Sequence, residues 1–499
     1  MAALSKNMNP KNKKPAKKTA GKKKFFITTA IPYANAAPHI GHALEVIQAD
    51  VIARRARQEG KKVFFLTGTD EHGDKVSRMA MQSGVAAKVF VNEISKKFKE
   101  FKKTLGISYD DFIRTTDKKK HWPGAYKLFS ELQKKGDIYE KEYEGLYCVG
   151  CEKFITEKDL EDGECPLHKK TPEKVSEKNL FFRLSRYESK IRSAINSGKV
   201  KILPEERKNE VLAFLDEGLE DVSFTRSRKN VPWGIPVKGT DQVMYVWCDG
   251  LANYISAIGY GRDKKMFEKW WPADVQLVGK DIFRFHGVYW LAMLMSAGLP
   301  LPKKLFIHGF ITVNGQKMSK TIGNVIKPDE AVSKYGRDPL RYYFLREIPS
   351  DGDGDFSFEK LATRYNDDLA KGLGNFASRI LNMVDGMVFP DKLTVSKEVR
   401  EEIKRARARV QKHFDEFRLN DALAAIFDLI KFGDTYINRT KPWENKNTKT
   451  ISDLVAMLRD VVFLIEPFMP ETSKKILSSL PVKNGKLRPK KIKPLFPRI

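Results

Sequence analysis

The sequence predicts an α/β fold, a parallel sheet of Rossmann-like topology followed by an all-helical C-terminal third. A strand-like run at Phe25–Ile31, a helical stretch over residues 39–59 and a second strand at Val63–Leu66 have the spacing of a right-handed βαβ unit. Beyond Asp355 the strand signals give way to helical periodicity, which predicts an antiparallel bundle from residues 366–385, 398–417, 419–440 and 451–466.

The rest of the sheet is expected from three later apolar runs, at Val243–Trp247, Val275–Val278 and Leu305–Ile307. Between residues 118 and 235 the sequence is rich in lysines, short turns and cysteines, which indicates an insertion between the two halves of the sheet. No GxGxxG dinucleotide-binding motif follows the first strand.

Composition excludes a membrane-embedded protein. Hydrophobic residues make up 41% of the chain and charged residues 31%, and no run of about 18 apolar residues is present. The Lys-rich start lacks the apolar segment of a secretory signal. We therefore expect a cytoplasmic protein.

The chain is strongly basic. Its 91 Lys and Arg residues against 63 Asp and Glu give a formal net charge of +28, and nine lysines with no acid lie in residues 1–24. That segment fits either a disordered solubilising tail or a nonspecific RNA-binding arm. The charge of the remaining chain favours a large polyanionic partner, because phosphate contacts release counterions.

Three of the four cysteines form a metal-binding pattern. The spacing Cys148-x2-Cys151-x13-Cys165-x2-His168 brings two close pairs of Zn²⁺ ligands together in a chain without a secretion signal. Four protein ligands leave no open position, so we expect one structural zinc per chain. The alternative, three free cysteines and a surface histidine, leaves the spacing unexplained. Cys248 is interpreted as a small apolar residue.

Two short motifs carry the candidate chemistry. Pro38-His39-Ile40-Gly41-His42 lies between the first strand and its helix, where free backbone N–H groups attract anions. Lys317-Met318-Ser319-Lys320-Thr321 follows the last predicted strand, and its ammonium groups can neutralise a departing pyrophosphate. Ordinary turn histidines and a solvated basic loop remain the alternatives for each motif alone. Together they are expected at the carboxyl ends of one sheet, where such folds bind ligands.

These motifs resemble the HIGH and KMSKS signatures of the class I aminoacyl-tRNA synthetases, with Thr321 in place of the more frequent serine. The segments 31–42, 68–73, 245–249, 279–286 and 308–321 look specifically like the methionyl-tRNA synthetase family, of the type with a single zinc knuckle. The resemblance extends from about residue 25 to the end. It implies a ligase that activates L-methionine with Mg²⁺-ATP and transfers it to the 3′-terminal adenosine of tRNA(Met), including the initiator.

The resemblance also implies residue roles. It assigns catalysis to His39, His42, Lys317 and Lys320, and ATP binding to Gly41, Glu45, Gly279, Asp281, His308, Ile311 and Ser319. It assigns methionine binding to Ile31, Tyr33, Asp70, Trp247, Tyr254, Ile282 and His286, with Asp70 on the ammonium group. Aromatic walls suit a polarizable thioether. Gly250 and Leu251 depart from the family pattern and are expected to reshape the pocket wall.

At the C-terminal end, Asn375 and Arg379 share one face of a predicted helix beside the apolar stripe Leu369, Leu373, Phe376 and Ile380. By resemblance, these two residues and Trp443 read the tRNA anticodon. An appended C-terminal domain found in some relatives is not expected, so a monomer is predicted.

Six segments are expected in all, the first from composition and the other five in agreement with the resemblance. They are a basic tail (1–24), a Rossmann-like catalytic domain in two halves (25–117 and 236–325), a connective insertion with the zinc knuckle (118–235), a linking stem-contact region (326–365) and a helical anticodon-binding domain (366–499).

Three other functions were weighed. Synthetases for leucine, isoleucine or valine usually carry an editing insertion longer than residues 118–235, and a cysteine enzyme needs an open metal position. A small nucleotidyltransferase would not need the helical third. An inactive RNA-binding paralogue would not need both signatures and Asp70.

Overall fold

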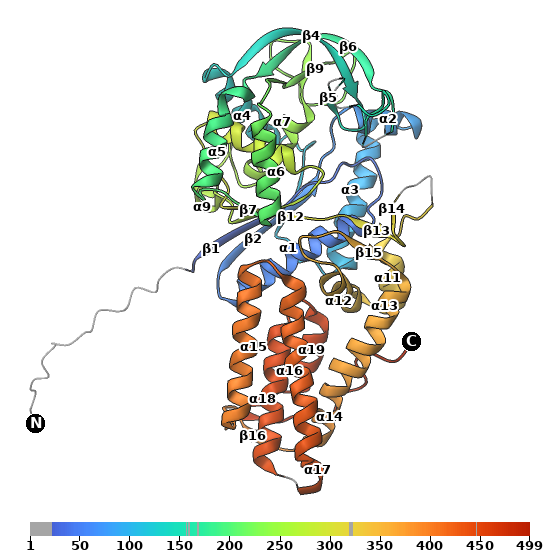
Figure 1. Cartoon of the computed structure of the whole chain (residues 1–499), viewed down its shortest axis with the longest axis vertical. Coiled ribbons are helices and arrows are strands. Elements are labelled where there is room, and N and C mark those ends of the chain that lie inside the picture. Colours follow the sequence, from blue (N-terminus) through green and yellow to red (C-terminus); the bar gives the residue numbers. More distant parts are fainter. Residues whose placement is uncertain (1–21, 156, 158–159, 167–168, 319–322, 446) are drawn as a thin grey trace, which may run out of the picture.

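The computed structural model describes residues 22–499, apart from residues 156, 158–159, 167–168, 319–322 and 446. Figure 1 shows an α/β body in the upper half of the molecule and a bundle of long helices in the lower half. The C-terminus lies beside the bundle helices rather than at their tip. The predicted division into a sheet-containing body and a helical C-terminal third is confirmed.

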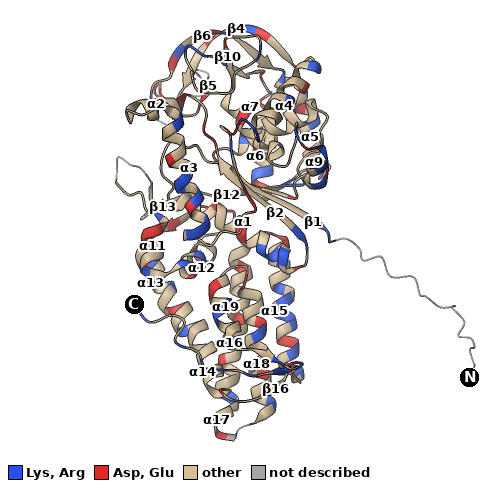
Figure 2. Cartoon of the chain, turned by 180° about the vertical axis from the view of Figure 1, so that it is seen from behind, with Lys and Arg blue, Asp and Glu red and all other residues tan. Residues whose placement is uncertain are grey.

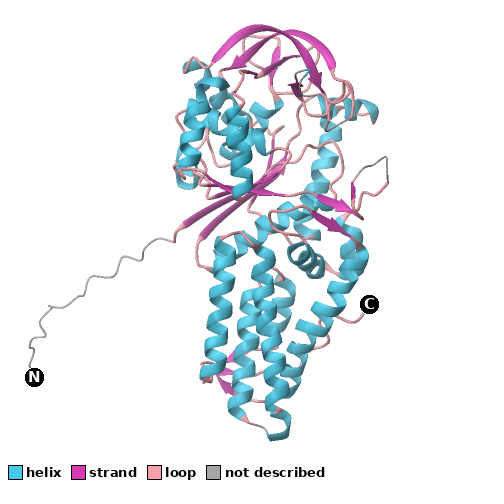
Figure 3. Cartoon of the chain, viewed as in Figure 1, coloured by secondary structure: helices cyan, strands magenta, loops and turns pink. Residues whose placement is uncertain are grey.

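A six-stranded, fully parallel sheet forms the centre of the body, in the order β3-β2-β1-β11-β12-β7. Figure 3 shows these strands side by side across the middle of the molecule. The order reverses between β1 and β11, and at such a switch point the loops diverge and leave a crevice for a ligand. The strands are β1 (Lys24–Thr29), β2 (Lys62–Thr69), β3 (Asp111–Arg114), β7 (Lys201–Leu203), β11 (Val275–Gly279) and β12 (Lys304–His308).

One predicted strand is wrong. Residues 243–247 do not join the parallel sheet: β10 (Gln242–Met244) pairs antiparallel with β9 (Thr225–Ser227), and helix α7 (Val246–Leu251) begins directly afterwards. The run of β-branched and aromatic residues has a strand's composition, but its second half is buried in the helix that forms a wall of the crevice. Tertiary packing overrides the local preference.

Helices cover both faces of the sheet. The helix predicted over residues 39–59 is α1 (Ile40–Gln58), and most of its length is buried. The other helices of the body are α2 (Asp74–Gln82), α3 (Ala87–Thr104), α4 (Trp122–Lys134), α5 (Glu188–Asn196), α6 (Glu205–Asp216), α8 (Asn253–Ser256), α9 (Lys264–Trp270), the π-helical η3 (Phe285–Trp290), α10 (Leu291–Ser296), α11 (Pro328–Tyr335) and α12 (Arg337–Glu347).

The expected insertion contains a separate antiparallel sheet in the order β5-β4-β6-β8, which arches over the top of the molecule in Figure 1. Its strands are β4 (Ile138–Cys148), β5 (Lys153–Ile155), β6 (Glu173–Phe182) and β8 (Val222–Ser223). The same stretch of chain also supplies β7 to the edge of the parallel sheet, next to β12. The insertion is therefore woven into the body as well as extending from it.

The helical third consists of the predicted long helices and a few short elements. They are α13 (Phe358–Arg364), the π-helical η4 (Tyr365–Gly374), α14 (Asn375–Met383), α15 (Lys397–Asp415), α16 (Leu419–Thr440), α17 (Pro442–Asn445), α18 (Thr448–Ile465) and α19 (Pro470–Ser478). Two small sheets flank them, one of β13 (Ile311–Val313), β14 (Gln316–Lys317) and β15 (Gly354–Phe356), the other of β16 (Phe389–Pro390), β17 (Val482–Lys483) and β18 (Lys486–Leu487).

Body and bundle share one hydrophobic core, which runs from the sheet and α1 into the bundle helices. A buried ion pair lies on the body's side of this junction, where Arg341 Nη2 of α12 is 2.8 Å from Asp50 Oδ2 of α1 and both side chains are fully buried. The same guanidinium donates to the backbone carbonyls of Leu105, Pro467 and Phe468. Because a buried charge is costly without partners, these contacts define how the bundle sits on α1.

The surface carries the positive charge that the composition indicates. Figure 2 shows Lys and Arg recurring along α3 and α15, interspersed with Asp and Glu. Among the described residues, no helix combines the length and the hydropathy needed to cross a bilayer.

Candidate active site

A cavity of about 650 Å³ opens at the carboxyl ends of the parallel strands. It is lined by every residue assigned above to catalysis, ATP or methionine whose side chain the structure describes. These residues are Ile31, Tyr33, His39, Gly41, His42, Glu45, Asp70, Trp247, Tyr254, Gly279, Asp281, Ile282, His286, His308 and Ile311. Segments far apart in the sequence thus meet at one place.

The histidine pair forms the start of α1. His39 is the N-cap residue, and its Nδ1 accepts from the Gly41 N–H at 3.1 Å, while His42 Nδ1 accepts from the His39 N–H at 3.2 Å. Burial lowers the pKa of His39 to about 4 and the pKa of His42 well below its usual value. Both rings are therefore neutral near pH 7, and because each Nδ1 accepts, each Nε2 carries the hydrogen. Gly41 leaves no room for a side chain, since an added Cβ would lie 2.9 Å from the His39 ring.

Glu45, one turn further along α1, forms a second polar cluster. Its carboxylate accepts from the Ala30 N–H at 2.6 Å and from His308 Nε2 at 3.2 Å. The other ring nitrogen, Nδ1, lies 2.9 Å from the Gly309 carbonyl, so His308 donates from both nitrogens. Burial alone would lower the pKa of His308, but Glu45 outweighs it and raises that pKa.

Asp70 lies at the end of β2 with its carboxylate at the cavity wall. Burial, together with the nearby carboxylates of Asp249 and Glu152, raises its pKa well above the usual value. A cationic ligand beside it would favour the charged form again. Gly250 makes room for this carboxylate, because a Cβ there would lie 2.7 Å from Asp70 Oδ2. The departure noted at Gly250 therefore has a steric reason.

An aromatic wall faces Asp70. The ring of Trp247 stacks on Phe285 with centroids 3.7 Å apart, and Tyr33 meets Trp247 edge to face at 6.3 Å. Tyr254 Oη lies 2.7 Å from His286 Nε2, and His286 Nδ1 lies 3.0 Å from the Ile282 carbonyl. Burial lowers the pKa of His286 to about 4, so the ring is neutral and its Nε2 accepts from the tyrosine. The wall is apolar with one oriented polar pair.

The second signature motif lies next to the first, as its residue Met318 shows. The side chain of Met318 lines the cavity, and its Cε would lie 3.3 Å from a Cβ on Gly41. Beyond the loop, the Ile326 carbonyl accepts from the Ile40 N–H at 3.1 Å. The two motifs therefore adjoin, as expected. Ser319, Lys320 and Thr321 lie outside the described residues, and of Lys317 only the backbone, in β14, is described.

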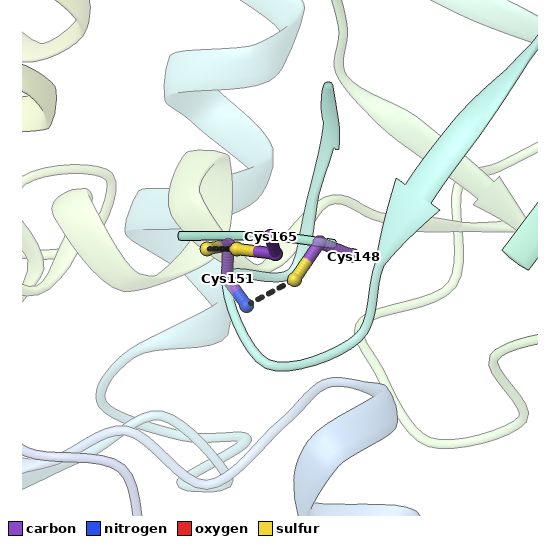
Figure 4. A group of neighbouring side chains, drawn as sticks. All are labelled: Cys148, Cys151 and Cys165. Carbon is purple, nitrogen blue, oxygen red and sulfur yellow. Dashed lines mark hydrogen bonds between the residues drawn. The ribbon is translucent and has the colours of Figure 1, made fainter. Parts of the chain in front are cut away.

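The cysteine cluster lies at the end of β4, in the insertion. The Sγ atoms of Cys148, Cys151 and Cys165 all lie within 4.8 Å of one another, and those of Cys151 and Cys165 are 3.6 Å apart. Figure 4 shows the three side chains converging, with the Cys151 N–H directed at the sulfur of Cys148 at 3.5 Å. Tetrahedral Zn²⁺ with Zn–S bonds of about 2.3 Å needs sulfurs about 3.8 Å apart, so the thiols fit the metal. His168 lies outside the described residues.

The residues assigned to the anticodon lie in the bundle. Asn375 and Arg379 are one turn apart on α14, and the stripe beside them is fully buried, as predicted. Arg379 donates to Asp434 Oδ1 at 3.1 Å and to Asn438 Oδ1 at 2.8 Å, both on α16. Trp443 on α17 is 50% exposed. An exposed tryptophan offers a stacking surface.

Sequence reasoning missed Glu152, the residue directly after Cys151. It is fully buried, and its Oε1 accepts from the Lys75 N–H at 2.7 Å, in the first turn of α2. Burial raises its pKa to about 8. The signal for Glu152 in the sequence was its position directly after Cys151. Glu152 does not line the cavity, whereas Lys75, Phe98 and Asn253 do, and these three had no signal of their own in the sequence.

Comparison with known families agrees with this geometry. A model described as "tRNA synthetases class I (M)" matches residues 25–171 and 157–381, and a model of the anticodon-binding domain of tRNA ligases matches residues 396–492. With a parallel-sheet body, adjoining signature motifs and a helical anticodon-binding region, the chain is a class I aminoacyl-tRNA synthetase.

The particular family follows from individual relatives. The methionine–tRNA ligase of Caldanaerobacter subterraneus is 44% identical over 92% of this chain and 74% of its own length, and that of Streptomyces coelicolor 40% identical over 92% and 90%. The structure of Mycobacterium tuberculosis methionyl-tRNA synthetase in complex with methionyl-adenylate superposes with a TM-score of 0.89 at 38% identity, covering 95% of this chain and 100% of that one. The chain belongs to the methionine–tRNA ligase family.

Proposed function

We propose that the cavity forms methionyl-adenylate from L-methionine and ATP, and that a ribose hydroxyl of the 3′-terminal adenosine of tRNA(Met), the initiator included, then attacks the adenylate carbonyl, loses its proton and displaces AMP. The gathering of the assigned residues around one cavity carries this proposal. Its volume of about 650 Å³ is within the usual range for small-molecule sites. The M. tuberculosis relative, similar along almost the whole chain, was solved with methionyl-adenylate.

The first step needs positioning rather than a base. An oxygen of the methionine carboxylate bonds to the α-phosphorus of ATP, the bond from that phosphorus to the bridging oxygen breaks, and pyrophosphate leaves. The carboxylate is already ionised, so no proton has to be removed. The Nε2–H groups of neutral His39 and His42 donate to phosphate oxygens where charge develops. Lys317 and Lys320 neutralise the leaving pyrophosphate, Ser319 contacts it, and Mg²⁺ accompanies the phosphates.

The adenosine occupies the part of the cavity between α1 and the ends of β11 and β12. Gly279 makes room for the Asp281 carboxylate, since a Cβ there would lie 2.8 Å from Asp281 Oδ1. The carboxylates of Asp281 and Glu45 accept hydrogen bonds from the nucleoside. His308 holds Glu45 in place, and Ile311 contacts the base beside it.

Methionine occupies the aromatic end. Asp70 binds the ammonium group, and the side chain lies against Ile31, Tyr33, Trp247 and Ile282. The oriented pair Tyr254–His286 provides a hydroxyl near the thioether. Apolar pockets separate ligands that differ by one methylene by only about 1–3 kcal/mol, so close analogues of methionine are expected to be activated slowly.

The cysteine cluster is proposed to hold one structural Zn²⁺, with Cys148, Cys151, Cys165 and His168 as ligands. Such a metal supplies a cross-link within the insertion and no substrate chemistry. Metal analysis of the purified protein should find one zinc per chain. A stoichiometry near zero in active protein would contradict the assignment.

For tRNA(Met), we propose that Asn375, Arg379 and Trp443 read the anticodon. The exposed indole can stack on an unpaired base, and Asn375 lies exposed on the same surface of α14 as Arg379.

For the domains, the boundaries expected from the sequence are proposed, with β7 contributed to the catalytic sheet from within the insertion. The expected monomer stays a prediction, which sedimentation would test.

The decisive experiment for the activity is exchange of pyrophosphate into ATP with each of the twenty amino acids. Exchange should depend strongly on methionine. Equal exchange with another amino acid would overturn the specificity, and none with any would overturn the activation step.

A further inference from the structure

Four buried polar side chains outside the cavity lining are joined in series by hydrogen bonds. They take no part in the steps proposed above. His72 Nδ1 is 2.6 Å from Asp249 Oδ2, Asp249 Oδ1 is 2.7 Å from His121 Nε2, and His121 Nδ1 is 2.8 Å from Ser256 Oγ. All four residues are at most 2% exposed. None of them lines the cavity.

Two of these residues, His72 and Asp249, belong to the segments that carry the methionine site. His72 is two residues after Asp70, in the loop that follows β2. Asp249 lies in α7, between Trp247 of the aromatic wall and Gly250, which makes room for the Asp70 carboxylate. The bond between His72 and Asp249 therefore ties the two walls of the methionine site to each other.

His121 anchors the far side of Asp249. Its Nδ1 lies 2.8 Å from Ser256 Oγ, and its Nε2 donates to Asp249 Oδ1 at 2.7 Å. The buried carboxylate of Asp249 therefore accepts a hydrogen bond from His72 on one oxygen and from His121 on the other.

These hydrogen bonds matter because Asp70 is a second buried carboxylate nearby. Two uncompensated carboxylates in one apolar region repel each other and favour protonation of one of them. Because His72 and His121 favour the charged form of Asp249, Asp70 is the carboxylate that needs a cationic ligand. The same contacts fix the position of α7, and small displacements of binding groups reduce affinity strongly.

We propose that His72, Asp249 and His121 are positioning residues that determine how tightly methionine binds, by holding the segments of Asp70 and Trp247 in place through the two hydrogen bonds to the Asp249 carboxylate. The proposal rests on the proposed methionine site. It assigns these three residues no contact with either substrate. Their removal should therefore affect methionine much more than ATP.

The test is pyrophosphate exchange with methionine and ATP varied separately. For Asp249→Asn and His72→Ala we expect the KM for methionine to rise about 10- to 100-fold, with the KM for ATP within about threefold of wild type. His72→Asn, whose amide can donate from nearly the same position as Nδ1, should recover most of the loss. His121→Gln should be milder than His121→Ala for the same reason.

Asp453→Asn is the matched control. Asp453 is fully buried in the bundle, where it accepts from Ser396 N–H and Tyr436 Oη, both at 2.7 Å. This variant should lose stability without any change in either KM.

Unequal effects on the two substrates, with rescue by His72→Asn, support the proposal. Equal effects on both KM values, a fall in kcat alone, or no effect would overturn it. If Asp249→Asn fails to fold, the variants His72→Ala and His72→Asn test the proposal by the same criteria. Wild-type protein without methionine-dependent exchange would instead refute the proposed function itself.

Discussion

The catalytic cavity and the tip of the helical bundle differ in how far their polar side chains are already arranged. In the cavity, His286 is buried, His39 and Glu45 are partly buried, and each is hydrogen-bonded within the protein. At the tip, Trp443 is half-exposed and Arg379 is engaged with Asp434, a partner that an RNA would have to displace. The cavity is preorganised for a small ligand, whereas the tip must exchange partners when it binds. Single substitutions should therefore reduce activity more in the cavity than at the tip of the bundle.

The largest effect is expected at Asp70. Asp70→Asn removes a buried charge partner of the substrate ammonium, a loss of about 2–5 kcal/mol. That corresponds to roughly a 30- to 5,000-fold fall in kcat/KM for methionine in pyrophosphate exchange. The control Asp216→Asn changes a surface ion pair with Arg192 and should be silent. Near-normal activity in Asp70→Asn would break the comparison at its strongest point.

At the tip, Trp443→Ala should weaken tRNA binding by about 1–3 kcal/mol, the usual value of a base stacked on an aromatic ring. The KM for tRNA in aminoacylation should rise by roughly 5- to 150-fold, while pyrophosphate exchange stays unchanged. Trp443→Phe keeps a stacking surface and should lose less. A parallel loss of exchange would show that the two regions are not separable in this way.

The burial of His286 in the cavity also predicts that the free energy of unfolding depends on pH. The pKa of His286 is about 4 in the fold against 6.5 in the unfolded chain, so the unfolded state takes up the proton first as pH falls. This histidine's contribution is complete above about pH 6.5 and is lost on the way down to pH 4, by roughly 2 kcal/mol at pH 5. Chemical unfolding at pH 7 and pH 5 should show a fall in stability for the wild type that is smaller by about this amount, roughly 2 kcal/mol, in His286→Gln.

The smallest effect should have the opposite sign. Asp434→Asn releases Arg379 from a partly exposed ion pair worth about 0.2–1 kcal/mol. The KM for tRNA should then fall by at most about fivefold. Asp428→Asn, which breaks another pair on the same helix, should leave it unchanged. A rise in KM for Asp434→Asn would mean that the pair positions Arg379 for the RNA instead of competing with it.

The sequence predicted what is carried by local pattern. The βαβ unit, the long helices and the meeting of His39 and His42 with Gly279, Asp281 and His308 follow from strand order and short motifs. The cysteine spacing likewise predicted the cluster of thiols. The failed strand at residues 243–247 shows the limit of composition, since the burial of α7 decided its conformation.

Contacts between distant segments were beyond reach. Nothing near His72, His121 or Asp249 in the sequence indicates that they meet, because they come from three separate elements. The role of β7 was hidden for a similar reason, as a three-residue strand inside a stretch of different character.

The Arg341–Asp50 pair has a practical consequence for anyone wishing to study amino-acid activation on a shorter protein. Cutting the chain before the bundle's last helices would remove the carbonyls of Pro467 and Phe468. The buried guanidinium of Arg341 would then lose two of its hydrogen-bond acceptors in the remaining fold. The same cut would strip apolar side chains from the core that α1 shares with the bundle. An excised upper half should thus come out insoluble or partly unfolded, and its inactivity would say nothing about tRNA.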